Sequence, residues 1–329
     1  MNVVKLSICI PTYNRLGYLT DLLDVLLPQI NNMPVEVCVS DNASSDNTCN
    51  YLHNLTKKYS FLKYKSNKKN IGIDENMFSA ISMGIGDYIY PLGDDDLLPS
   101  GTLSLILSEI NSCADVIILN GWHTDPFHNP KTKHLPNKLL GKIIKNPQDA
   151  FVNLWDKMPF GSFLAKRECF NSKSFEEYFD TSHAYTGVVW DKLLDIYKNT
   201  GECMVVCMIE PTVYLRGGDK TWKDNTVKIM LIEIPMWFSI IRNKKEYNAI
   251  AGLTFNKYRK KQTKLLNLVR YGSLGQLYNL DDDMLYKYYN WLQITKIKFV
   301  RKIPVFILLQ LAGIRDIIMI IFRRLFRNE

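Results

Sequence analysis

The sequence contains no CxxC pair, although seven cysteines occur among its 329 residues. It therefore has no zinc-finger spacing. The odd number of cysteines, together with the apolar runs around Cys9 and Cys38, predicts buried, reduced thiols as in cytosolic proteins. The composition also lacks any strong bias, with 47% hydrophobic and 22% charged residues. Disordered, collagen-like and low-complexity chains are thereby excluded.

Glycine-rich phosphate-binding loops are absent as well. No GxGxxG follows the first predicted strand, and the pattern GxxxxGK[ST] does not occur. These absences speak against a dinucleotide-dependent oxidoreductase and against a P-loop NTPase. The first residues form a strand-like run and not a signal peptide, so we expect the chain to stay on the cytoplasmic side of a membrane.

Acidic and basic residues are unevenly distributed along the chain. Residues 1–100 contain 8 Lys and Arg against 11 Asp and Glu, residues 101–221 contain 13 against 14, and residues 222–329 contain 20 against 8. The basic surplus therefore belongs to the last third. This pattern argues against a nucleic-acid coat and favours chemistry in the front part, with an anionic surface bound by the last part.

Strand-like and helical stretches alternate in the first third. Strands are predicted at 5–10, 35–40, 61–64, 87–92 and 114–119, with helices at 16–27, 74–83 and after Pro99. Units of this length predict an α/β fold with a doubly wound, mostly parallel sheet. Ligands of such sheets bind beyond the carboxyl ends of the strands. Polar clusters stand at three of these ends, at 11–15, 41–42 and 94–96.

The sharpest feature is the run Asp94-Asp95-Asp96. Three adjacent carboxylates repel one another, and a divalent cation such as Mg²⁺ or Mn²⁺, which prefers oxygen ligands, would offset their charge. On an extended chain Asp94 and Asp96 would face the same side. The alternative is a solvated acidic loop that caps the helix after Pro99, and the two neighbouring polar clusters make the metal site the better interpretation.

Asp41 ends a strand that is predicted to be buried. Its carboxylate can accept an N–H from a pyrimidine base, either the ring N3–H of uracil or the exocyclic amine of cytosine. The alternative is an ordinary turn aspartate that accepts a hydrogen bond from its own backbone.

Four motifs together carry a resemblance to a known family. They are SICIPTYNR at 7–15, VSDNASSDNT at 39–48, NIGIDEN at 70–76 and GDYIYPLGDDD at 86–96. In this order and spacing they resemble the family 2 glycosyltransferases, which have the GT-A fold, over about residues 5–120. The resemblance implies a nucleotide-sugar donor, a divalent metal (Mn²⁺ or Mg²⁺) and transfer of a sugar.

The resemblance also implies which positions bind the donor. They are Pro11, Thr12, Tyr13, Asn14, Asp41, Asn76, Asp94 and Asp95. The first four would line the nucleoside pocket, and Asp41 would hold the base. Asp94 would approach the ribose or the sugar, and Asp96, with Asp94, would bind the metal. Gly93 stands where the family often has an aspartate, which leaves open how the three aspartates share these roles.

The residues of two motifs are similar to those of one subgroup of the family. Ser40–Ser44 and Gly93–Asp96 resemble bacterial O-antigen abequosyltransferases. That likeness implies a cytidine diphosphate dideoxyhexose, such as CDP-abequose, as the donor.

The middle third is expected to hold the acceptor side. In the resembled family an acidic pair opens a helix near this point, and its aspartate is the catalytic base of inverting members. Trp190-Asp191 falls there, so Asp191 would deprotonate the acceptor hydroxyl; a helix ion pair is the alternative. Trp190 would form a sugar platform with His183 nearby, unless Trp190 is part of the core.

The segment 213–222 ends this part with a strand and a Gly-Gly turn. Arg216 or Lys220 would neutralise the leaving diphosphate, and Trp222 would belong to a loop that closes on the donor. A plain hairpin turn is equally compatible with this segment. Three further histidines at 123, 128 and 134 are expected in solvent or in an acceptor loop.

The last third is apolar and basic. Apolar stretches cover 226–241 and 304–322, and basic residues fill 257–270 and flank the second apolar stretch. Because Arg315-Asp316 interrupts that stretch, an in-plane anchor on anionic lipid fits better than a span. Buried or oligomer-forming helices are the other alternative. We therefore expect three parts: a nucleotide-sugar half at 1–120, an acceptor half at 121–222 and a helical membrane-associating region at 223–329.

These expectations combine into one predicted function. The enzyme would sit at the cytoplasmic face of the bacterial inner membrane and transfer a sugar from a CDP- or UDP-sugar to an undecaprenyl-diphosphate-linked oligosaccharide, in O-antigen or related synthesis. A UDP-hexose transferase for another glycan is an alternative. A nucleotidyltransferase would need a basic glycine-rich loop after the first strand, and a non-catalytic membrane adaptor would not need the aspartate run. Nucleic acid is not an expected partner.

Overall fold

The computed structural model describes residues 3–170, 172–217 and 225–313. By packing, the chain divides into residues 1–218, here called unit 1, and residues 219–329, called unit 2. Each unit is described by itself. The predicted division at residue 120 does not interrupt the packing of unit 1, because one sheet contains strands from both sides of that position.

The described part of unit 1 is built on a nine-stranded sheet with the order β3-β2-β1-β4-β8-β5-β9-β7, in which β6 pairs with β5. The strands are β1 (Leu6–Thr12), β2 (Val35–Asp41), β3 (Leu62–Ser66), β4 (Tyr88–Pro91), β5 (Val116–Thr124), β6 (Pro130–Lys133), β7 (Ile143–Ile144), β8 (Phe163–Lys166) and β9 (Val205–Arg216). Neighbours among β1 to β4 are all parallel. The second half is mixed, because β8 is antiparallel to both β4 and β5, whereas β9 is parallel to β5.

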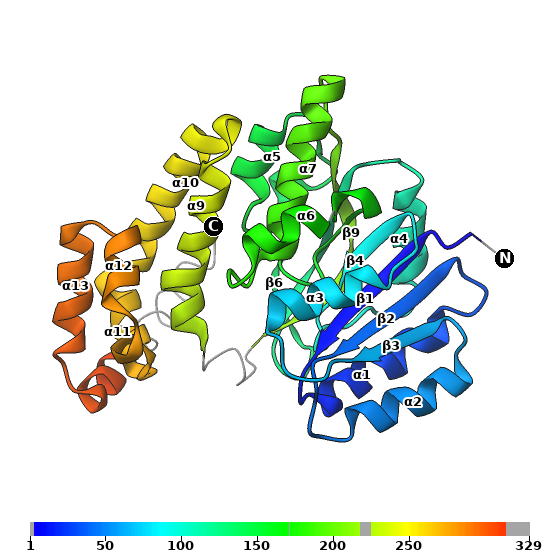
Figure 1. The fold of residues 1–329 in the computed structure, drawn as a ribbon, viewed down its shortest axis with the longest axis horizontal. Coiled ribbons are helices and arrows are strands. Elements are labelled where there is room, and N and C mark those ends of the chain that lie inside the picture. The colour runs from blue at the N-terminus through cyan, green and yellow to red at the C-terminus, as the bar shows by residue number, and fades with distance from the viewer. Residues whose placement is uncertain (1–2, 171, 218–224, 314–329) are drawn as a thin grey trace. The chain divides into compact units, whose positions relative to one another are not determined.

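Helices cover both faces of this sheet. They are α1 (Leu16–Leu26), α2 (Thr48–Lys58), α3 (Ile73–Ser82), α4 (Thr102–Ile110), α5 (Pro147–Leu154), α6 (Ser172–Phe175) and α7 (Ala184–Thr200). Figure 1 shows α1 and α2 on one side of β1 to β3 and α3 on the other. Every residue of β1 and β2 is buried as a result, which explains why apolar residues predominate in β1 and alternate with polar ones along most of β2.

The core of unit 1 forms where the leucine stripe of α1 meets the sheet. Leu19, Leu22, Leu23 and Leu26 recur at helical spacing, and all four are fully buried. They belong to one apolar cluster with alternate residues of β1 and β2. Five of the seven cysteines are buried, as predicted, whereas Cys113 is exposed.

The described part of unit 2 is helical. It contains a π-helical turn (Ile229–Glu233), α9 (Ile234–Arg242), α10 (Lys245–Gln262), α11 (Leu265–Ser273), α12 (Asp282–Tyr288) and α13 (Trp291–Arg301). The apolar stretch 226–241 supplies its core, since Phe238 packs against the rings of Trp237, Phe255 and Tyr258. For this stretch the alternative of buried helices is therefore correct.

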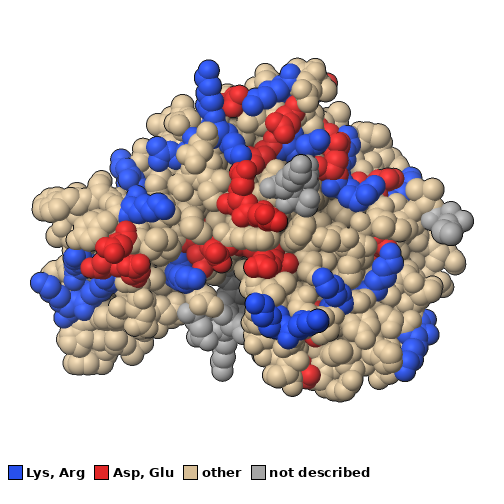
Figure 2. Space-filling model, in the orientation of Figure 1, with Lys and Arg blue, Asp and Glu red and all other residues tan. Residues whose placement is uncertain are grey.

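The apolar stretch 304–322 is described only as far as residue 313, and residues 305–313 are helical. Within the described ranges, no helix combines the length and the apolar character that a membrane crossing requires. Acidic and basic side chains lie side by side on the viewed face of α11 to α13 (Figure 2). Asp282, for example, forms ion pairs with Lys298 and Arg301.

Candidate active site

The ends of β1, β2 and β4 bring the three predicted polar clusters to one edge of the sheet. Thr12 and Asp41, the last residues of β1 and β2, are register partners. The N–H of Asn42 donates to the Thr12 carbonyl at 2.9 Å, and the N–H of Leu92, just after β4, donates to the carbonyl of Cys9. The predicted convergence at the carboxyl edge is confirmed.

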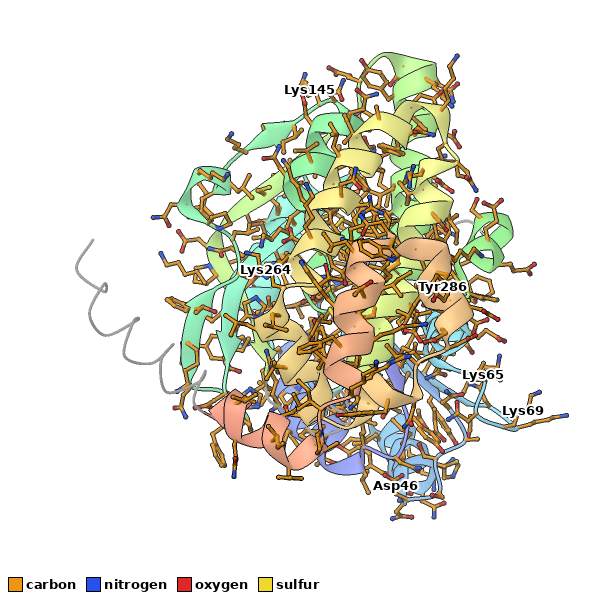
Figure 3. The ribbon with its side chains drawn as sticks, turned by 90° about the vertical axis from the view of Figure 1, so that its left-hand side faces the viewer. Asp46, Lys65, Lys69, Lys145, Lys264 and Tyr286 are labelled. Carbon is orange, nitrogen blue, oxygen red and sulfur yellow. The ribbon has the colours of Figure 1, made fainter. Side chains whose placement is uncertain are left out.

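Asp41 is fully buried at this edge. Its Oδ1 accepts the N–H of Ser44 at 3.1 Å, and its Oδ2 accepts the hydroxyl of Ser66 at 2.8 Å. The bond from Ser44 is the local turn contact that the sequence left open as an alternative. Ser66 itself is exposed, so the group that Asp41 presents to the surface is the Ser66 hydroxyl. Lys65 and Lys69 project outward from the same strand end and the loop after it (Figure 3).

Asn76 lies behind the strand ends and not in an open pocket. It is 1% exposed. Its Nδ2 donates to the carbonyls of Thr12 (3.3 Å) and Ser40 (3.1 Å), and its Oδ1 accepts the Ser40 hydroxyl. Asn76 therefore fastens β1 to β2, a structural role that differs from the donor contact implied by the resemblance.

The loop that follows β1 is held in one conformation by the loop that follows β2. Asn14 adopts a left-handed φ of 51°, which asparagine tolerates better than most residues. Its Oδ1 accepts the N–H of Ser45 at 2.7 Å, and its own N–H donates to Ser44 Oγ at 2.8 Å. Pro11 and Thr12 are buried, whereas Tyr13 is 43% exposed. Tyr13 directly follows Thr12, the register partner of Asp41, and so places an accessible ring at this edge of the sheet.

The three aspartates stand in a turn. The N–H of Asp96 donates to the carbonyl of Gly93 at 3.4 Å. The expectation of an extended chain here is therefore wrong, and the alternation of an extended strand is no longer a reason for Asp94 and Asp96 to share a side. Asp94 accepts the Thr12 hydroxyl at 2.8 Å and pairs with Arg15 at 3.2 Å, and Arg15 also pairs with Asp95 at 2.6 Å.

Asp96 is 6% exposed, and two glycines make room for it. A Cβ added to Gly161 would lie 2.4 Å from Asp96 Oδ2, and one added to Gly93 would lie 2.8 Å from it. The space that Asp96 needs thus explains why glycine stands at position 93. The N–H of Arg216 donates to Asp96 Oδ1 at 3.1 Å, because a bridge between Leu97 and Tyr214 fixes β9 beside the turn.

Asp96 is held in surroundings that disfavour its negative charge. Burial raises the pKa of Asp96 well above its usual range, and the charges of Asp95 and Asp94 add to the rise, while the N–H of Arg216 opposes it. A nearby cation would favour the ionised form. Among the described residues, no three His, Cys, Asp or Glu side chains group as ligands for one ion. The donor set instead fits Mg²⁺ or Mn²⁺, which needs only one or two carboxylates when substrate phosphates complete the coordination.

Arg15 is the site residue that sequence reasoning missed. It ends the first motif, and its guanidinium neutralises two of the three aspartates. The signal was present, because a run of three carboxylates needs a counter-charge as well as a metal. Arg216 is placed at the end of β9, and its guanidinium contacts His128 and Asp21. Lys220 and Trp222 lie outside the described residues.

The helix that was expected to open at Trp190-Asp191 opens earlier, at Ala184, which is six residues before Trp190 and seven before Asp191. Asp191 lies about 10 Å further along the helix axis, where Tyr178 donates to its Oδ1 at 3.0 Å. The acid at the helix start is Asp74 of α3, whose carboxylate accepts the N–H groups of Ser182 (2.8 Å) and Ala184 (3.0 Å). The expected position of the acidic pair at Trp190-Asp191 is therefore wrong.

Trp190 is a core residue. It is fully buried, and it packs edge-on against Phe151 with 5.2 Å between the ring centroids. Of the two roles that the sequence left open for Trp190, the core position, which was the better interpretation, is confirmed. The sugar platform is wrong, because no sugar can reach a ring enclosed in this way. His183 lies directly before α7, half-buried, with its ring nearly parallel to that of Tyr185. Tyr185 in turn stacks on Phe160, next to Gly161.

The expectation of solvent-facing histidines is wrong for His134, which is 4% exposed. Its Nε2 lies 3.1 Å from the Lys157 carbonyl, and its Nδ1 lies 3.1 Å from His123 Nε2. A carbonyl only accepts, so His134 donates from Nε2 and accepts from His123 at Nδ1. Burial lowers the pKa of His134 to about 4, so the pair is neutral at pH 7.

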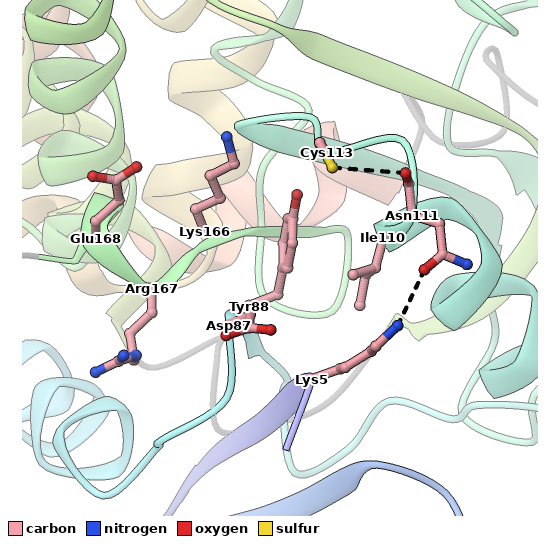
Figure 4. Close-up of a pocket in the computed structure, with 9 residues that line it drawn as sticks. All are labelled: Lys5, Asp87, Tyr88, Ile110, Asn111, Cys113, Lys166, Arg167 and Glu168. Atoms are coloured by element: carbon pink, nitrogen blue, oxygen red, sulfur yellow. Dashed lines mark hydrogen bonds between the residues drawn. The ribbon is translucent and has the colours of Figure 1, made fainter. Parts of the chain in front are cut away.

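Two cavities of unit 1 lie at opposite edges of the sheet. One, of about 470 Å³, is lined by Lys5, Tyr88, Asn111 and Lys166 at the amino ends of β1 and β4 (Figure 4). The other, of about 560 Å³, is lined by residues that include Asn14, Arg15, Tyr18 and Arg216. Only the second lies at the carboxyl edge, where sheets of this type bind ligands.

These features can be compared with known proteins. The sequence model described as "Glycosyl transferase family 2" matches residues 7–172, just over half of the chain, and the matched part contains Thr12, Asp41 and the aspartate turn. The chain belongs to glycosyl transferase family 2. It is therefore a glycosyltransferase, and the predicted family is confirmed.

Two curated members of the family show the range of similar enzymes. Abequosyltransferase RfbV of Salmonella typhimurium is 28% identical over 232 residues, which cover 66% of this chain and 68% of that enzyme. A Campylobacter jejuni enzyme named GalNAc(5)-diNAcBac-PP-undecaprenol beta-1,3-glucosyltransferase is 34% identical over 111 residues, about a third of each protein (32% and 35%).

Two solved structures share the fold of this glycosyltransferase. S. aureus TarS 1–349 in complex with UDP-GlcNAc matches with a TM-score of 0.59 and 16% identity, over 91% of this chain and 90% of that one. The mannosyltransferase PcManGT from Pyrobaculum calidifontis, in complex with GDP-Man and Mn²⁺, matches with a TM-score of 0.51 and 13% identity, over 99% and 88%. At these identities the likeness concerns the fold.

Proposed function

We propose that this family 2 glycosyltransferase transfers a sugar from a pyrimidine nucleoside diphosphate donor to a hydroxyl of a lipid-linked oligosaccharide. The observation that supports this most is the meeting of Thr12, Asp41 and the aspartate turn at one edge of the sheet. That edge combines an exposed ring at Tyr13, the exposed hydroxyl of Ser66 that Asp41 fixes, and a concentration of negative charge at Asp94–Asp96.

The base stacks on Tyr13 and hydrogen-bonds at Ser66. Because the Ser66 hydroxyl donates to Asp41, its oxygen lone pairs are left to accept an N–H from the base. Uracil offers its N3–H and cytosine its exocyclic amine, so both pyrimidines suit this group. Asp41 fixes the hydroxyl in place.

Asp96 is the residue that holds a divalent cation, Mn²⁺ or Mg²⁺, with Asp94 beside it. Such a cation stabilises the negative charge that develops on the leaving diphosphate. PcManGT was solved with Mn²⁺, which supports a metal of this kind in the proposal. The chain itself contributes the space for Asp96, through Gly93 and Gly161.

The donor proposed first is a CDP-dideoxyhexose, as for an abequosyltransferase of O-antigen synthesis, because the likeness to RfbV extends over two thirds of both chains. A UDP-hexose donor is the second candidate, which the complex of TarS with UDP-GlcNAc supports. An undecaprenyl-diphosphate-linked oligosaccharide is the proposed acceptor, in keeping with the name of the C. jejuni relative.

We further propose that Asp191 is the proton acceptor of the reaction, as the sequence predicts. If it deprotonates the acceptor hydroxyl, Asp191→Asn lowers kcat by at least about 100-fold with little change in KM for the donor. An undiminished kcat in that variant would remove Asp191 from the reaction and leave it as a helix residue held by Tyr178.

The enzyme is proposed to work at the cytoplasmic face of a bacterial inner membrane, bound peripherally through unit 2. Trp291 and Phe299 are 78% and 58% exposed on α13. Lys296 and Lys298 lie between them in the sequence, and Lys302 follows the end of the helix. Exposed aromatic rings among lysines suit the interface of an anionic bilayer. This arrangement brings the enzyme to an acceptor that is itself held in the lipid.

A thermal-shift screen of the full chain tests the donor. UDP-, CDP-, GDP- and dTDP-sugars are added separately, each with Mn²⁺, and a ligand that binds the folded state raises the melting temperature. We expect stabilisation by CDP- or UDP-sugars and none by GDP-sugars. Stabilisation by GDP-sugars alone would overturn the pyrimidine assignment, and stabilisation by none would overturn the proposed function.

A further inference from the structure

Two arginines far apart in the sequence lie over one tyrosine ring. The guanidinium carbon of Arg15 is 4.7 Å from the centroid of the Tyr18 ring, and that of Arg216 is 4.9 Å from the same centroid. The two cations are therefore at most about 10 Å apart. Both distances fall within the range of a cation–π contact.

Each arginine is also tied to the aspartate turn. Arg15 pairs with Asp94 and Asp95. Arg216 is tied through its backbone, whose N–H donates to Asp96. The side chain of Arg216 is 7% exposed, and its Nε has no hydrogen-bond partner among the described residues. The arginines are thus fixed beside the aspartates from two directions, one from the start of α1 and one from the end of β9.

The cavity at the carboxyl edge is bounded by these three side chains. Arg15, Tyr18 and Arg216 line it, together with Asp21 and Asp46. Asp46 is occupied as an acceptor for the N–H groups of Leu16 and Thr48. Asp21 is 59% exposed and pairs with Arg216 at 3.3 Å. Because the carboxylate of Asp21 lies in solvent, an incoming anion can take its place on a guanidinium that His128 also contacts at 2.7 Å.

We propose that Tyr18 is a positioning residue, which holds the guanidinium groups of Arg15 and Arg216 at the spacing that grips the two phosphates of the donor. The inference rests on the proposed function, because it assigns part of the same donor site. Planar guanidinium groups bind phosphate oxygens in pairs and stack on aromatic faces, whereas an ammonium group does neither as well. Tyr18 therefore acts through the arginines and needs no contact with the donor.

The test measures binding of CDP and UDP against CMP and UMP to the full chain by titration calorimetry. The paired guanidinium groups of Arg15 and Arg216 are expected to add to the binding free energy only when the nucleotide has a second phosphate. We expect Tyr18→Leu to weaken diphosphate binding about tenfold, from the loss of two cation–π contacts, and to leave monophosphate binding unchanged. Tyr18→Phe keeps the ring and is expected to bind as the wild type does.

Arg15→Lys is a second variant, which keeps the charge and removes the planar group. It is expected to lose part of the preference for diphosphates even if Tyr18→Leu does not fold. If these variants weaken mono- and diphosphate binding equally, or weaken neither, the inference about Tyr18 is overturned. The proposed function still stands in that case, provided that the wild type binds the nucleotides. If the wild type binds none of the four nucleotides, the proposed function itself fails.

Discussion

Unit 1 and unit 2 keep their charged side chains in different surroundings. In unit 1, carboxylates such as Asp41, Asp74 and Asp96 are almost completely buried, and each accepts at least one backbone N–H, which for Asp74 and Asp96 comes from a distant segment. In unit 2, the described charges lie mainly at the surface, and large apolar residues such as Trp291 and Phe306 lie exposed among them. Buried carboxylates are costly unless they are paired, so unit 1 keeps them where chemistry requires them.

The difference shows where sequence carries functional information. The burial of carboxylates at strand ends constrains residue identity and spacing, and the family model accordingly matches only within unit 1. A surface that binds lipid needs only a mixture of apolar and basic residues. The proposed membrane role of unit 2 therefore depends on its basic and apolar composition and on the exposure of its large apolar side chains.

The largest expected effect is that of Asp96→Asn. Removal of a group that stabilises charge in the transition state costs about 100- to 1000-fold in kcat, and we expect this size of loss in a sugar-transfer assay. Asp95→Asn is the matched control, because Asp95 is more exposed than Asp96 and is paired with Arg15. It should lose about tenfold or less. Equal losses would contradict the special position of Asp96.

Gly161→Ala is expected to lower kcat by about 100-fold, because the new Cβ would displace Asp96, and small misplacements of a site residue cost this much. Gly161 and Gly101 both have positive φ values, of 77° and 85°, but no atom lies within 4 Å of a Cβ added to Gly101. Gly101→Ala thus carries the backbone strain alone. A transfer assay on both variants separates strain from displacement, and equal activities would show that Asp96 does not need this space.

The His123–His134 pair predicts a pH dependence of stability in unit 1. The pKa of His134 is about 4 in the folded protein against 6.5 in a model compound. Between these values the unfolded chain binds a proton that the folded chain does not, so stability is complete above pH 6.5 and falls as the pH drops towards 4. From pH 7 to pH 5 the loss from this group is about 2 kcal/mol.

The measurement is the free energy of unfolding of wild type and His134→Gln at both pH values. The variant should lose about 2 kcal/mol less than the wild type over this interval. The exposed His53 provides the control, since His53→Gln should leave the wild-type difference in place. A pH dependence that persists in His134→Gln would assign it to other groups.

A smaller effect than these is expected at the surface of unit 2. Replacement of Trp291 and Phe299 by serine removes two exposed apolar rings, and burial of such rings contributes about 1.5–3 kcal/mol each at most. We expect binding to anionic vesicles to weaken at least about tenfold in a sedimentation assay. Ile85→Ser with Ile143→Ser, at exposed positions of unit 1, is the control. Unchanged binding of the α13 variant would remove that face from the membrane proposal.

The sequence predicted the site in unit 1 because its elements are local. The leucine stripe of α1 and the polar ends of β1, β2 and β4 are visible in short segments, and the structure brings them together as expected. What failed depends on distant residues. The turn at 93–96 is set by Gly161 and Arg216, which lie 65 and 120 positions beyond Asp96, and no local pattern encodes them.

The same reason explains the errors in the middle third. Trp190 is buried because Phe151, from another helix, covers it. The start of α7 is set at Ala184 by Asp74, more than a hundred residues earlier in the chain. Helix periodicity does not reveal such a cap. Arg15 was overlooked for a different reason, since its partners were seen only as metal ligands.

The central claim is that the nucleotide binds at the carboxyl edge of the sheet in unit 1. Calorimetric titration of the full chain with CDP and UDP in the presence of Mn²⁺ tests it when wild type is compared with Tyr13→Ala and Asn111→Ala. These residues belong to opposite edges, and both are accessible. Loss of base stacking should weaken binding in Tyr13→Ala at least about fivefold, with Asn111→Ala unchanged. Weaker binding in Asn111→Ala with Tyr13→Ala unchanged would contradict the claim.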